Sequence, residues 1–373
     1  MDPFDPDLLP KASGLTNIGQ TCYFNSMLQA LLTCTSLTKT ILTLKPLSKN
    51  KLLLAYAELI QNPNPNQSVV IWQTMMDILK QTQRFPHFRD QQQDSHESFH
   101  IFLELLGDPD PEKTEKKKKT EEGEEEDKKA ELSEVEKIFR TRFRSRIVCK
   151  ECGTCTESKQ EEIFINLNQT DKIPESIKYK NSMVEDYTCD NCAKAHLLES
   201  PKKCEMCTKI CHRILYDRKL LMCPDCQPNF IFTFPDNYKT MLCDLCTNIY
   251  EIIHDNPYKR LICDKCKPIY KEKKTQVTIQ TRLTMVRSCI VILFNKYENK
   301  YLFNYPESFS IGENNQFVYK AVAQIEHSGG MNGGHYWALA KRNGGDYVLN
   351  DGSASPASLN PTDSTYLVFY HLQ

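Results

Sequence analysis

A cysteine near the start of the chain, Cys22, has the setting of a reactive thiol. It follows the turn-forming segment Asn17-Ile18-Gly19 and begins an apolar stretch that predicts a helix. A thiol in the first turn of a helix faces unpaired backbone amides and the positive end of the helix dipole, and both stabilise the thiolate. We therefore expect a lowered pKa for Cys22, although a buried cysteine at a helix end explains this segment equally well. Cys34 has no such setting and is expected in the core.

A nucleophilic thiol needs a general base, and His335 is the candidate. It follows the glycine-rich segment at 329–334 and begins a predicted strand. Glycines allow a backbone or an extended substrate to approach closely. Further along, Asn350 and Asp351 lie near the end of another predicted strand, where either could orient the imidazole through its second nitrogen. Taken alone, His335 is more simply a surface or structurally satisfied histidine, but together these residue types make a hydrolytic triad.

The residues around Cys22 predict a mostly helical region at 14–107, after a proline-rich lead-in at 1–13. Apolar residues recur at steps of three and four, as a helix with one buried face requires. These residues are Phe24, Met27, Leu28, Leu31 and Leu32, and the segments LLLAYAELI (52–60), VIWQTMMDILK (70–80) and SFHIFLELL (98–106) have the same character.

The C-terminal region, 289–373, predicts an antiparallel sheet. Its apolar segments are rich in β-branched and aromatic residues and are separated by Gly, Asn and Pro. The turn between two of these strands is expected at Asn343-Gly344-Gly345-Asp346. The predicted strands are 289–294, 317–327, 335–342, 346–351 and 365–372.

Residues 108–137 form a highly charged segment with little apolar surface. Such a segment buries too little to offset the entropy of ordering it, so we expect a flexible insert. Its lysine run is followed at once by acidic residues, which favours a solvated linker over a nuclear address.

The region at 138–288 contains repeated Cys-x-x-Cys pairs, and three similar segments end in such pairs. The intervals between pairs are typical of zinc ribbons, in which four thiolates hold Zn²⁺ and leave no position for water. Four ligands per ion would give up to three structural zinc sites, with the pairing among the later cysteines left open. Cys155, Cys211 and His212 are single and irregular, and are expected to be bystanders. The expected ligands are Cys149, Cys152, Cys189, Cys192, Cys204, Cys207, Cys223, Cys226, Cys243, Cys246, Cys263 and Cys266.

Composition narrows the classes of function. The chain has 373 residues, 40% of them hydrophobic, and a formal net charge of -1, which disfavours nucleic acid as the partner. No apolar stretch is long enough for a membrane span, and the N-terminus lacks the pattern of a secretion signal. We expect a globular protein in the cytoplasm, the nucleus or both, where 17 cysteines indicate metal binding more than disulfides.

Three separated motifs, in the expected order, resemble those of the ubiquitin-specific proteases. Residues 14–29 resemble the cysteine box of this family, QQQDSHESFHIFL (91–103) its Gln-Gln-Asp element, and Gly334-His335-Tyr336 with Asn350-Asp351 its histidine box. The resemblance covers about two-thirds of the chain. Two departures are Gln20, where Asn is common, and FNKY at 294–297, which replaces Leu-Lys-Arg-Phe.

The resemblance implies an α+β fold with a papain-like right-hand architecture: a helical thumb, zinc-ribbon fingers and an antiparallel-sheet palm. It implies a deubiquitinating thiol protease, with ubiquitin and ubiquitinated proteins as partners. Cys22 would be the nucleophile, His335 the base, Asn350 its orienting partner with Asp351 in support, and Asn17 a donor to the oxyanion. The residues that would bind the ubiquitin tail are Gln93, Asp94, Gly333, Gly334 and Tyr336.

Asp94 has a second explanation, because Asp-Ser-His-Glu before an apolar segment is also a helix cap. Three alternatives to the main hypothesis remain. The chain could be a catalytically weak ubiquitin-binding scaffold of the same fold, a protease for a ubiquitin-like modifier, or a zinc-ribbon protein that binds nucleic acid. The last would need basic stripes with aromatic residues, and only 209–220 and 258–274 are modestly basic.

Overall fold

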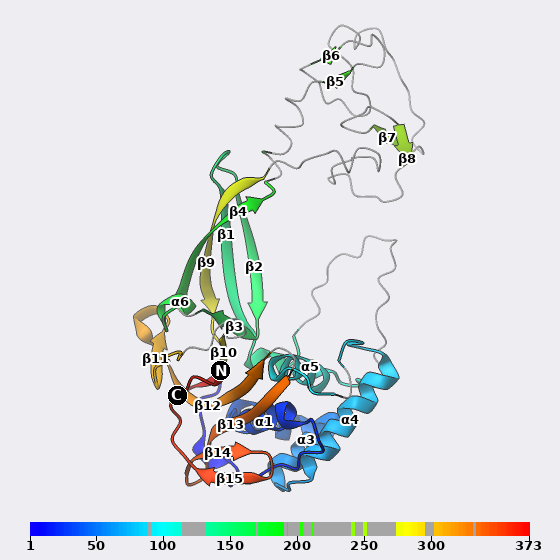
Figure 1. Ribbon diagram of the computed structural model, residues 1–373, viewed down its shortest axis with the longest axis vertical. Helices are drawn as coiled ribbons and strands as arrows, with labels where there is room; N and C mark the ends of the chain where they lie inside the picture. Colours follow the sequence, from blue (N-terminus) through cyan, green and yellow to red (C-terminus); the bar gives the residue numbers. More distant parts are fainter. Residues whose placement is uncertain are drawn as a thin grey trace.

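The computed structural model shows a body of helices and sheet from which a second, long sheet extends (Figure 1). It describes residues 1–88, 91–113, 132–168, 171–189, 192, 274–294, 302–330 and 333–373, with the backbone of four short strands at 202–203, 210–211, 240–242 and 249–251. Most of the predicted insert at 108–137 and the cysteine pairs from Cys204 to Cys266 lie outside the described residues.

The N-terminal region is helical, as predicted. Its α-helices are α1 (Cys22–Leu31), α2 (Thr35–Leu44), α3 (Lys51–Gln61), α4 (Gln67–Thr82) and α5 (Ser95–Gly107), with 3₁₀ turns η1 (Pro6–Leu8), η2 (Lys45–Leu47) and η3 (Glu136–Ile138). Asn50 caps α3, because its side chain accepts hydrogen bonds from the amides of Leu52 and Leu53. These helices form the thumb.

Helix α1 is buried at every position, not on one face as the spacing predicted. It lies between two layers, because it contacts α4 and α5 on the helical side and three strands of the large sheet on the other, namely β12 (Phe317–Gly330), β13 (Gly333–Arg342) and β14 (Gly345–Asn350). Polar residues such as Asn25 and Gln29 are therefore buried too, and each finds partners in neighbouring segments. The first residue of this enclosed helix is Cys22.

The large sheet forms the palm. Its order is β15-β14-β13-β12-β16-β10-β3, with β11 paired to β12. All of its pairs are antiparallel except β10 with β3, a parallel pair that the predicted antiparallel sheet did not include. The strands are β3 (Phe164–Leu167), β10 (Cys289–Phe294), β11 (Ser308–Ile311), β12 (Phe317–Gly330), β13 (Gly333–Arg342), β14 (Gly345–Asn350), β15 (Ser353–Pro356) and β16 (Thr365–Leu372).

Strand β16 shows why the palm sheet separates two cores. Successive side chains of a strand point to opposite faces. Leu367 and Phe369 pack with the helices, whereas Val368 and Tyr370 pack in a second apolar cluster on the other face. All eight residues of the strand are buried. A strand covered on both faces is uniformly apolar, as TYLVFYHL largely is.

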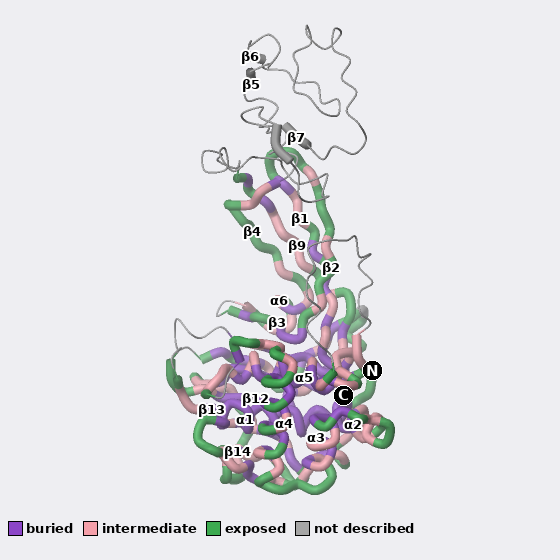
Figure 2. Tube along the Cα trace, turned by 90° about the vertical axis from the view of Figure 1, so that its right-hand side faces the viewer, coloured by how far each residue is buried: buried purple, intermediate pink, exposed green. Residues whose placement is uncertain are grey.

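A four-stranded antiparallel sheet of order β2-β1-β9-β4 forms the arm that corresponds to the fingers. Figure 2 shows buried residues concentrated in the body, whereas the two outer strands of the arm, β2 and β4, are largely exposed. The arm strands are β1 (Thr141–Cys149), β2 (Cys155–Glu162), β4 (Tyr179–Tyr187) and β9 (Thr275–Met285), with α6 (Glu175–Lys178) before β4. Further along, β5 (Lys202–Lys203) pairs with β6 (Ile210–Cys211), and β7 (Thr240–Leu242) pairs with β8 (Ile249–Glu251).

Two segments outside the predicted elements pack against the body. In the lead-in, the Phe4 amide donates to Leu372 O at 2.7 Å and Pro10 O accepts from the Asn343 amide at 3.1 Å. At the end of the charged insert, Val135 is fully buried and Ser133 exchanges hydrogen bonds with Glu136. Residues 132–137 therefore belong to the packed body.

Among the described helices, none is individually long and apolar enough to cross a bilayer. The sharply bent pair Cys22–Leu31 and Thr35–Leu47 meets those criteria only when its two parts are counted together.

Candidate active site and metal site

Cys22 begins α1 and is 4% exposed. Its sulfur accepts a hydrogen bond from the backbone amide of Tyr336, and Gln92 Nε2 lies 3.8 Å away. Burial raises the pKa of the Cys22 thiol, the negative charge of Asp351 raises it further, and the backbone amides only partly compensate. The predicted lowering of this pKa is therefore wrong for the unliganded site, because tertiary burial outweighs the helix start.

His335 lies on β13, next to the residue whose amide contacts the Cys22 sulfur. Its Nε2 is 2.7 Å from Asn350 Oδ1, and its ring stacks on Trp337 with centroids 5.9 Å apart. An amide oxygen only accepts, so this contact assigns the proton to Nε2 and leaves Nδ1 as an acceptor. The described side chains of Cys22 and His335 share no hydrogen bond in this state.

The Asp351 carboxylate makes its hydrogen bonds with asparagines near Cys22 and not with His335. Its two carboxylate oxygens accept from Asn17 Nδ2 and Asn25 Nδ2, each at 2.9 Å. Its backbone oxygen accepts from the Leu15 amide at 2.7 Å, and its φ of 45° is in the left-handed region. The structure thus separates the two neighbours: Asn350 meets the imidazole, and Asp351 holds the segment before Cys22.

Both the oxygen and the nitrogen of the Asn17 side-chain amide make hydrogen bonds. Its Oδ1 accepts from the Gly19 amide at 2.9 Å and from the amide and hydroxyl of Thr21, each at 3.2 Å. With one Nδ2 hydrogen donated to Asp351, a second Nδ2 hydrogen remains for another acceptor. The Asn17-Ile18-Gly19 turn is fixed by this side chain.

Asp94 caps α5, as the helix-cap explanation predicted. One carboxylate oxygen accepts from the His96 amide at 2.7 Å. The Tyr366 hydroxyl contacts both oxygens at 2.9 Å, and the Tyr336 hydroxyl lies 3.4 Å from one of them. Asp94 therefore joins the start of α5 to the palm beside Gly333 and Gly334. Gln93, which directly precedes Asp94, is half-buried.

The two glycines before His335 are constrained in different ways, Gly334 by close packing and Gly333 by its backbone conformation. A Cβ at Gly334 would lie 2.4 Å from His327 Nε2 and 2.6 Å from Ser328 O. Gly333 has a φ of 150°, and a Cβ there would lie 3.6 Å from Gln92 Oε1. The His327 ring in turn stacks on Tyr336, with centroids 4.3 Å apart.

Sequence reasoning missed two parts of this site. Gln92 is the first glutamine of the Gln-Gln-Asp element, yet only its two successors were assigned a role. Asn25 lies within the cysteine box, and the sequence predicts no function for it, although its side-chain amide bonds to Asp351. Motif membership was the only signal available for either residue, because both partners lie far away in the sequence.

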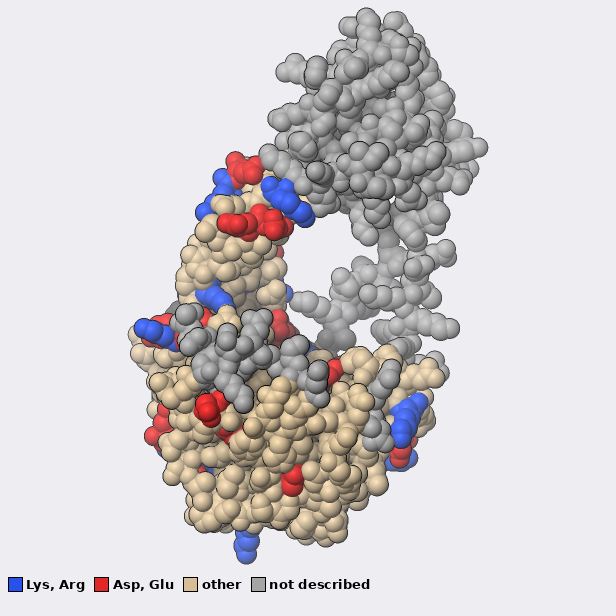
Figure 3. Space-filling view, viewed as in Figure 1, with Lys and Arg blue, Asp and Glu red and all other residues tan. Residues whose placement is uncertain are grey.

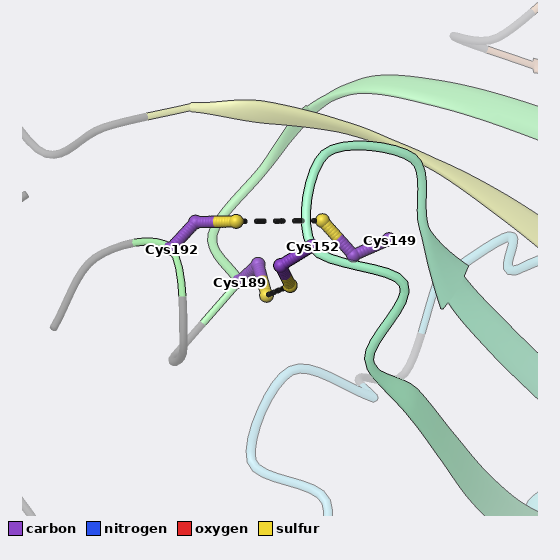
Figure 4. A group of neighbouring side chains, drawn as sticks. All are labelled: Cys149, Cys152, Cys189 and Cys192. Carbon is purple, nitrogen blue, oxygen red and sulfur yellow. Dashed lines mark hydrogen bonds between the residues drawn. The ribbon is translucent and has the colours of Figure 1, made fainter. Parts of the chain in front are cut away.

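The four cysteines of the first predicted zinc ribbon meet at the end of the arm (Figure 4). Cys149 is the last residue of β1, Cys152 lies in the turn that follows, and Cys189 and Cys192 come after β4. The sulfurs of Cys149 and Cys192 are 3.6 Å apart, those of Cys152 and Cys189 are 3.5 Å apart, and all four lie within 4.8 Å of one another.

This spacing fits a tetrahedral metal. Zn–S bonds of about 2.3 Å place sulfurs about 3.8 Å apart in a tetrahedron. Cys155 lies outside the cluster and accepts a hydrogen bond from Arg146 Nε at 3.0 Å, consistent with a bystander. The donor set therefore suits a structural Zn²⁺.

A family model for ubiquitin carboxyl-terminal hydrolases matches residues 13–370, so the chain belongs to the ubiquitin carboxyl-terminal hydrolase family. The fold is similar to that of the SAGA Ubp8/Sgf11/Sus1/Sgf73 DUB module bound to ubiquitin aldehyde, at 16% identity and a TM-score of 0.59 over 100% of this chain and 72% of that chain. The yeast SAGA DUB module with an altered Sgf73 gives 17% identity and a TM-score of 0.56 over 100% and 71%.

A module with an Ubp8 variant bound to monoubiquitin gives 16% identity and a TM-score of 0.54 over 100% of this chain and 71% of that chain. At such identities the similarity concerns the fold, and it confirms the α+β right-hand architecture. Family membership supports hydrolysis at the C-terminus of ubiquitin as the activity.

Proposed function

We propose that this chain is a cysteine-type deubiquitinase that hydrolyses the peptide or isopeptide bond after the C-terminal glycine of ubiquitin. The observation that carries the proposal is the 2.7 Å contact between His335 Nε2 and Asn350 Oδ1, made beside the Cys22 sulfur. His335 lies on β13, and the backbone amide of the next residue, Tyr336, bonds to that sulfur. A base with a defined tautomer thus lies beside a thiol at a helix start. Family membership supports ubiquitin as the substrate.

In the first half of the reaction, His335 Nδ1 takes the thiol proton as the Cys22 sulfur attacks the glycine carbonyl. The raised pKa of Cys22 favours proton transfer during the attack over a preformed ion pair. The Cys22 backbone amide and the free Nδ2 hydrogen of Asn17 would stabilise the oxyanion. Collapse gives a thioester, and the leaving amine takes the proton from His335.

In the second half, His335 deprotonates a water that attacks the thioester. The ubiquitin carboxylate leaves and the thiol regains its proton. Asn350 keeps the ring in one tautomer throughout, and an uncharged amide suffices for that task.

The ubiquitin tail would bind along Gly333 and Gly334, with Gln93, Asp94 and Tyr336 beside it. The close packing of Gly334 against His327 supports a narrow channel that suits a Gly-Gly end. A carboxylate at Asp94 could pair with a basic residue of the tail.

Zinc would hold the end of the arm through Cys149, Cys152, Cys189 and Cys192, with a structural role. Further zinc ions, up to three in all, would use the later cysteine pairs outside the described residues. We also propose the cytoplasm, the nucleus or both as the location.

Nucleic-acid binding gains no support from the described surface. On the face in Figure 3, basic and acidic side chains of the arm lie close together. Arg142 pairs with Glu161 at 2.6 Å, and Lys180 pairs with Asp171 at 3.5 Å. Mixed charges of this kind are typical of a solvated surface.

A second candidate is a ubiquitin-binding scaffold of low activity. Two observations favour it: burial raises the pKa of the Cys22 thiol, and the described side chains of Cys22 and His335 share no hydrogen bond. A ubiquitin probe with a C-terminal electrophile separates the two. Covalent capture by the wild type and not by Cys22→Ala supports the protease, whereas reversible binding alone supports the scaffold.

A turnover assay tests which modifier the chain cleaves. A panel of fluorogenic ubiquitin and ubiquitin-like substrates should show turnover of ubiquitin first. Turnover of another modifier in preference to ubiquitin would contradict the proposed substrate.

A further inference from the structure

Gln92 contacts both the Cys22 side and the His335 side of the candidate active site. Its Nε2 lies 3.8 Å from Cys22 Sγ and also donates to Gly334 O, one residue before His335. The Gly334 carbonyl oxygen would repel the side-chain oxygen of Gln92. The atom of Gln92 that lies near both Gly334 O and Cys22 Sγ is therefore Nε2 and not Oε1.

Both hydrogens of this amide have distinct directions. One is directed to Gly334 O, and the other faces the Cys22 sulfur. The backbone of Gln92 is fixed as well, because its amide donates to Gln20 Oε1 at 2.8 Å. Gln20 is the residue that departs from the usual Asn in the cysteine box, and its longer side chain makes this contact.

The position suits stabilisation of a negative charge. When the Cys22 sulfur attacks a carbonyl, the S–C bond forms and the negative charge develops on the oxygen attached to that carbon. A donor nitrogen 3.8 Å from the sulfur is within reach of that oxygen, and its fixed orientation requires no rearrangement when the charge develops.

We propose that Gln92 is a catalytic residue that donates a hydrogen bond to the oxyanion, in addition to the Cys22 amide and Asn17. This inference rests on the proposed thiol hydrolase function. In the unliganded site the Nε2 hydrogen that faces the sulfur contacts the thiol, and in the tetrahedral intermediate it binds the oxyanion while Gly334 O keeps the amide in place.

The test compares Gln92→Ala and Gln92→Glu with the wild type on a fluorogenic ubiquitin C-terminal amide. The Glu variant keeps the size and removes the donor. Both should lower kcat by about 100-fold, as loss of one oxyanion donor does in other hydrolases. Affinity for ubiquitin aldehyde, which forms a tetrahedral adduct, should fall in parallel, whereas the Kd for free ubiquitin should change by less than about threefold.

Gln91→Ala is the matched control, because Gln91 is exposed and adjacent. It should retain wild-type kcat, and thermal unfolding should show that all variants are folded. A kcat of Gln92→Ala that equals or exceeds the wild-type value, with the wild type active, would overturn this inference alone. Absence of turnover by the wild type on any modifier would overturn the proposed function and this role together.

Discussion

The Asn25 side-chain amide donates to Asp351 at 2.9 Å, across 326 positions of the sequence. Asn25 belongs to α1 in the thumb, and Asp351 follows β14 in the palm. The same carboxylate accepts from Asn17 at 2.9 Å, so one acidic side chain connects the segment before Cys22 to the sheet that carries His335. Asp351 therefore makes contacts distinct from those of Asn350, which meets the imidazole.

Replacing Asp351 with Asn should make Cys22 more reactive toward alkylation at low pH. The carboxylate raises the pKa of the Cys22 thiol, so its removal should lower that pKa and move the alkylation profile to lower pH. The measurement is the rate of iodoacetamide labelling against pH, with Cys22→Ala as the background. The same variant should lose kcat, because Asn17 loses its anchor. An unshifted profile would contradict the assigned charge interaction.

Replacing His335 with Ala should lower kcat by about 1,000-fold while leaving ubiquitin binding largely intact, because the ring moves protons and contributes little to affinity. His87→Ala is a suitable control, since His87 is exposed and its contact is with Glu97 on α5. Steady-state kinetics measure kcat, and a ubiquitin binding titration measures the affinity for ubiquitin. Equal losses of turnover and affinity would show that His335 mainly holds the fold.

Replacing Cys149 with Ser should remove one equivalent of zinc per chain. Three thiolates leave the tetrahedral site incomplete, and the fourth position then exchanges readily. Metal analysis of the purified chain gives the stoichiometry, and thermal unfolding should show a lower Tm. Cys155→Ser, outside the cluster, should keep the full zinc content. Full zinc content in Cys149→Ser would exclude Cys149 as a ligand.

Stability should fall between about pH 6.5 and pH 4 because of His371. Burial lowers the pKa of His371 to about 4, below the ordinary value of 6.5. The lowered pKa means that the neutral ring is favoured when folded, so its contribution is complete above pH 6.5 and is lost as pH falls toward 4. A shift of this size corresponds to about 3 kcal/mol.

The structure shows why His371 resists protonation. Its Nε2 accepts from the Ser36 amide at 3.3 Å, and Nδ1 lies 2.9 Å from Leu372 O. Urea unfolding at pH 7 and pH 5 should show a smaller pH dependence for His371→Gln than for the wild type. An identical dependence in both would mean that other groups govern acid unfolding.

Much of the fold was predictable because local patterns carry it. The helices around Phe24 and Phe102 follow from apolar periodicity, and the strands at 289–294 and 365–372 follow from β-branched and aromatic content. The β13–β14 turn was predicted from Asn343-Gly344, and Gly344 has a φ of 99° there. The first cysteine cluster was predictable because paired spacing reflects metal geometry.

The features that were missed depend on contacts between distant segments. The raised pKa of Cys22 comes from burial, which a local sequence window does not contain. The parallel β10–β3 pair joins segments on either side of the cysteine-rich region. The contact of Gln92 with Gly334 joins residues that are 242 positions apart. Local patterns determined the elements, and tertiary packing determined the electrostatics of the site.

The close approach of Gly14 to Gly352 has a mechanical consequence. A Cβ at Gly14 would lie 2.2 Å from the Gly352 backbone, and the neighbouring Leu15 amide bonds to Asp351 O. Thumb and palm are thus in direct backbone contact at Gly14, whereas side chains such as Gln92 and Asp94 connect them beside the glycines of β13. Any side chain at position 14 would therefore push the start of the thumb away from the palm and weaken the hydrogen bond between the Leu15 amide and Asp351 O.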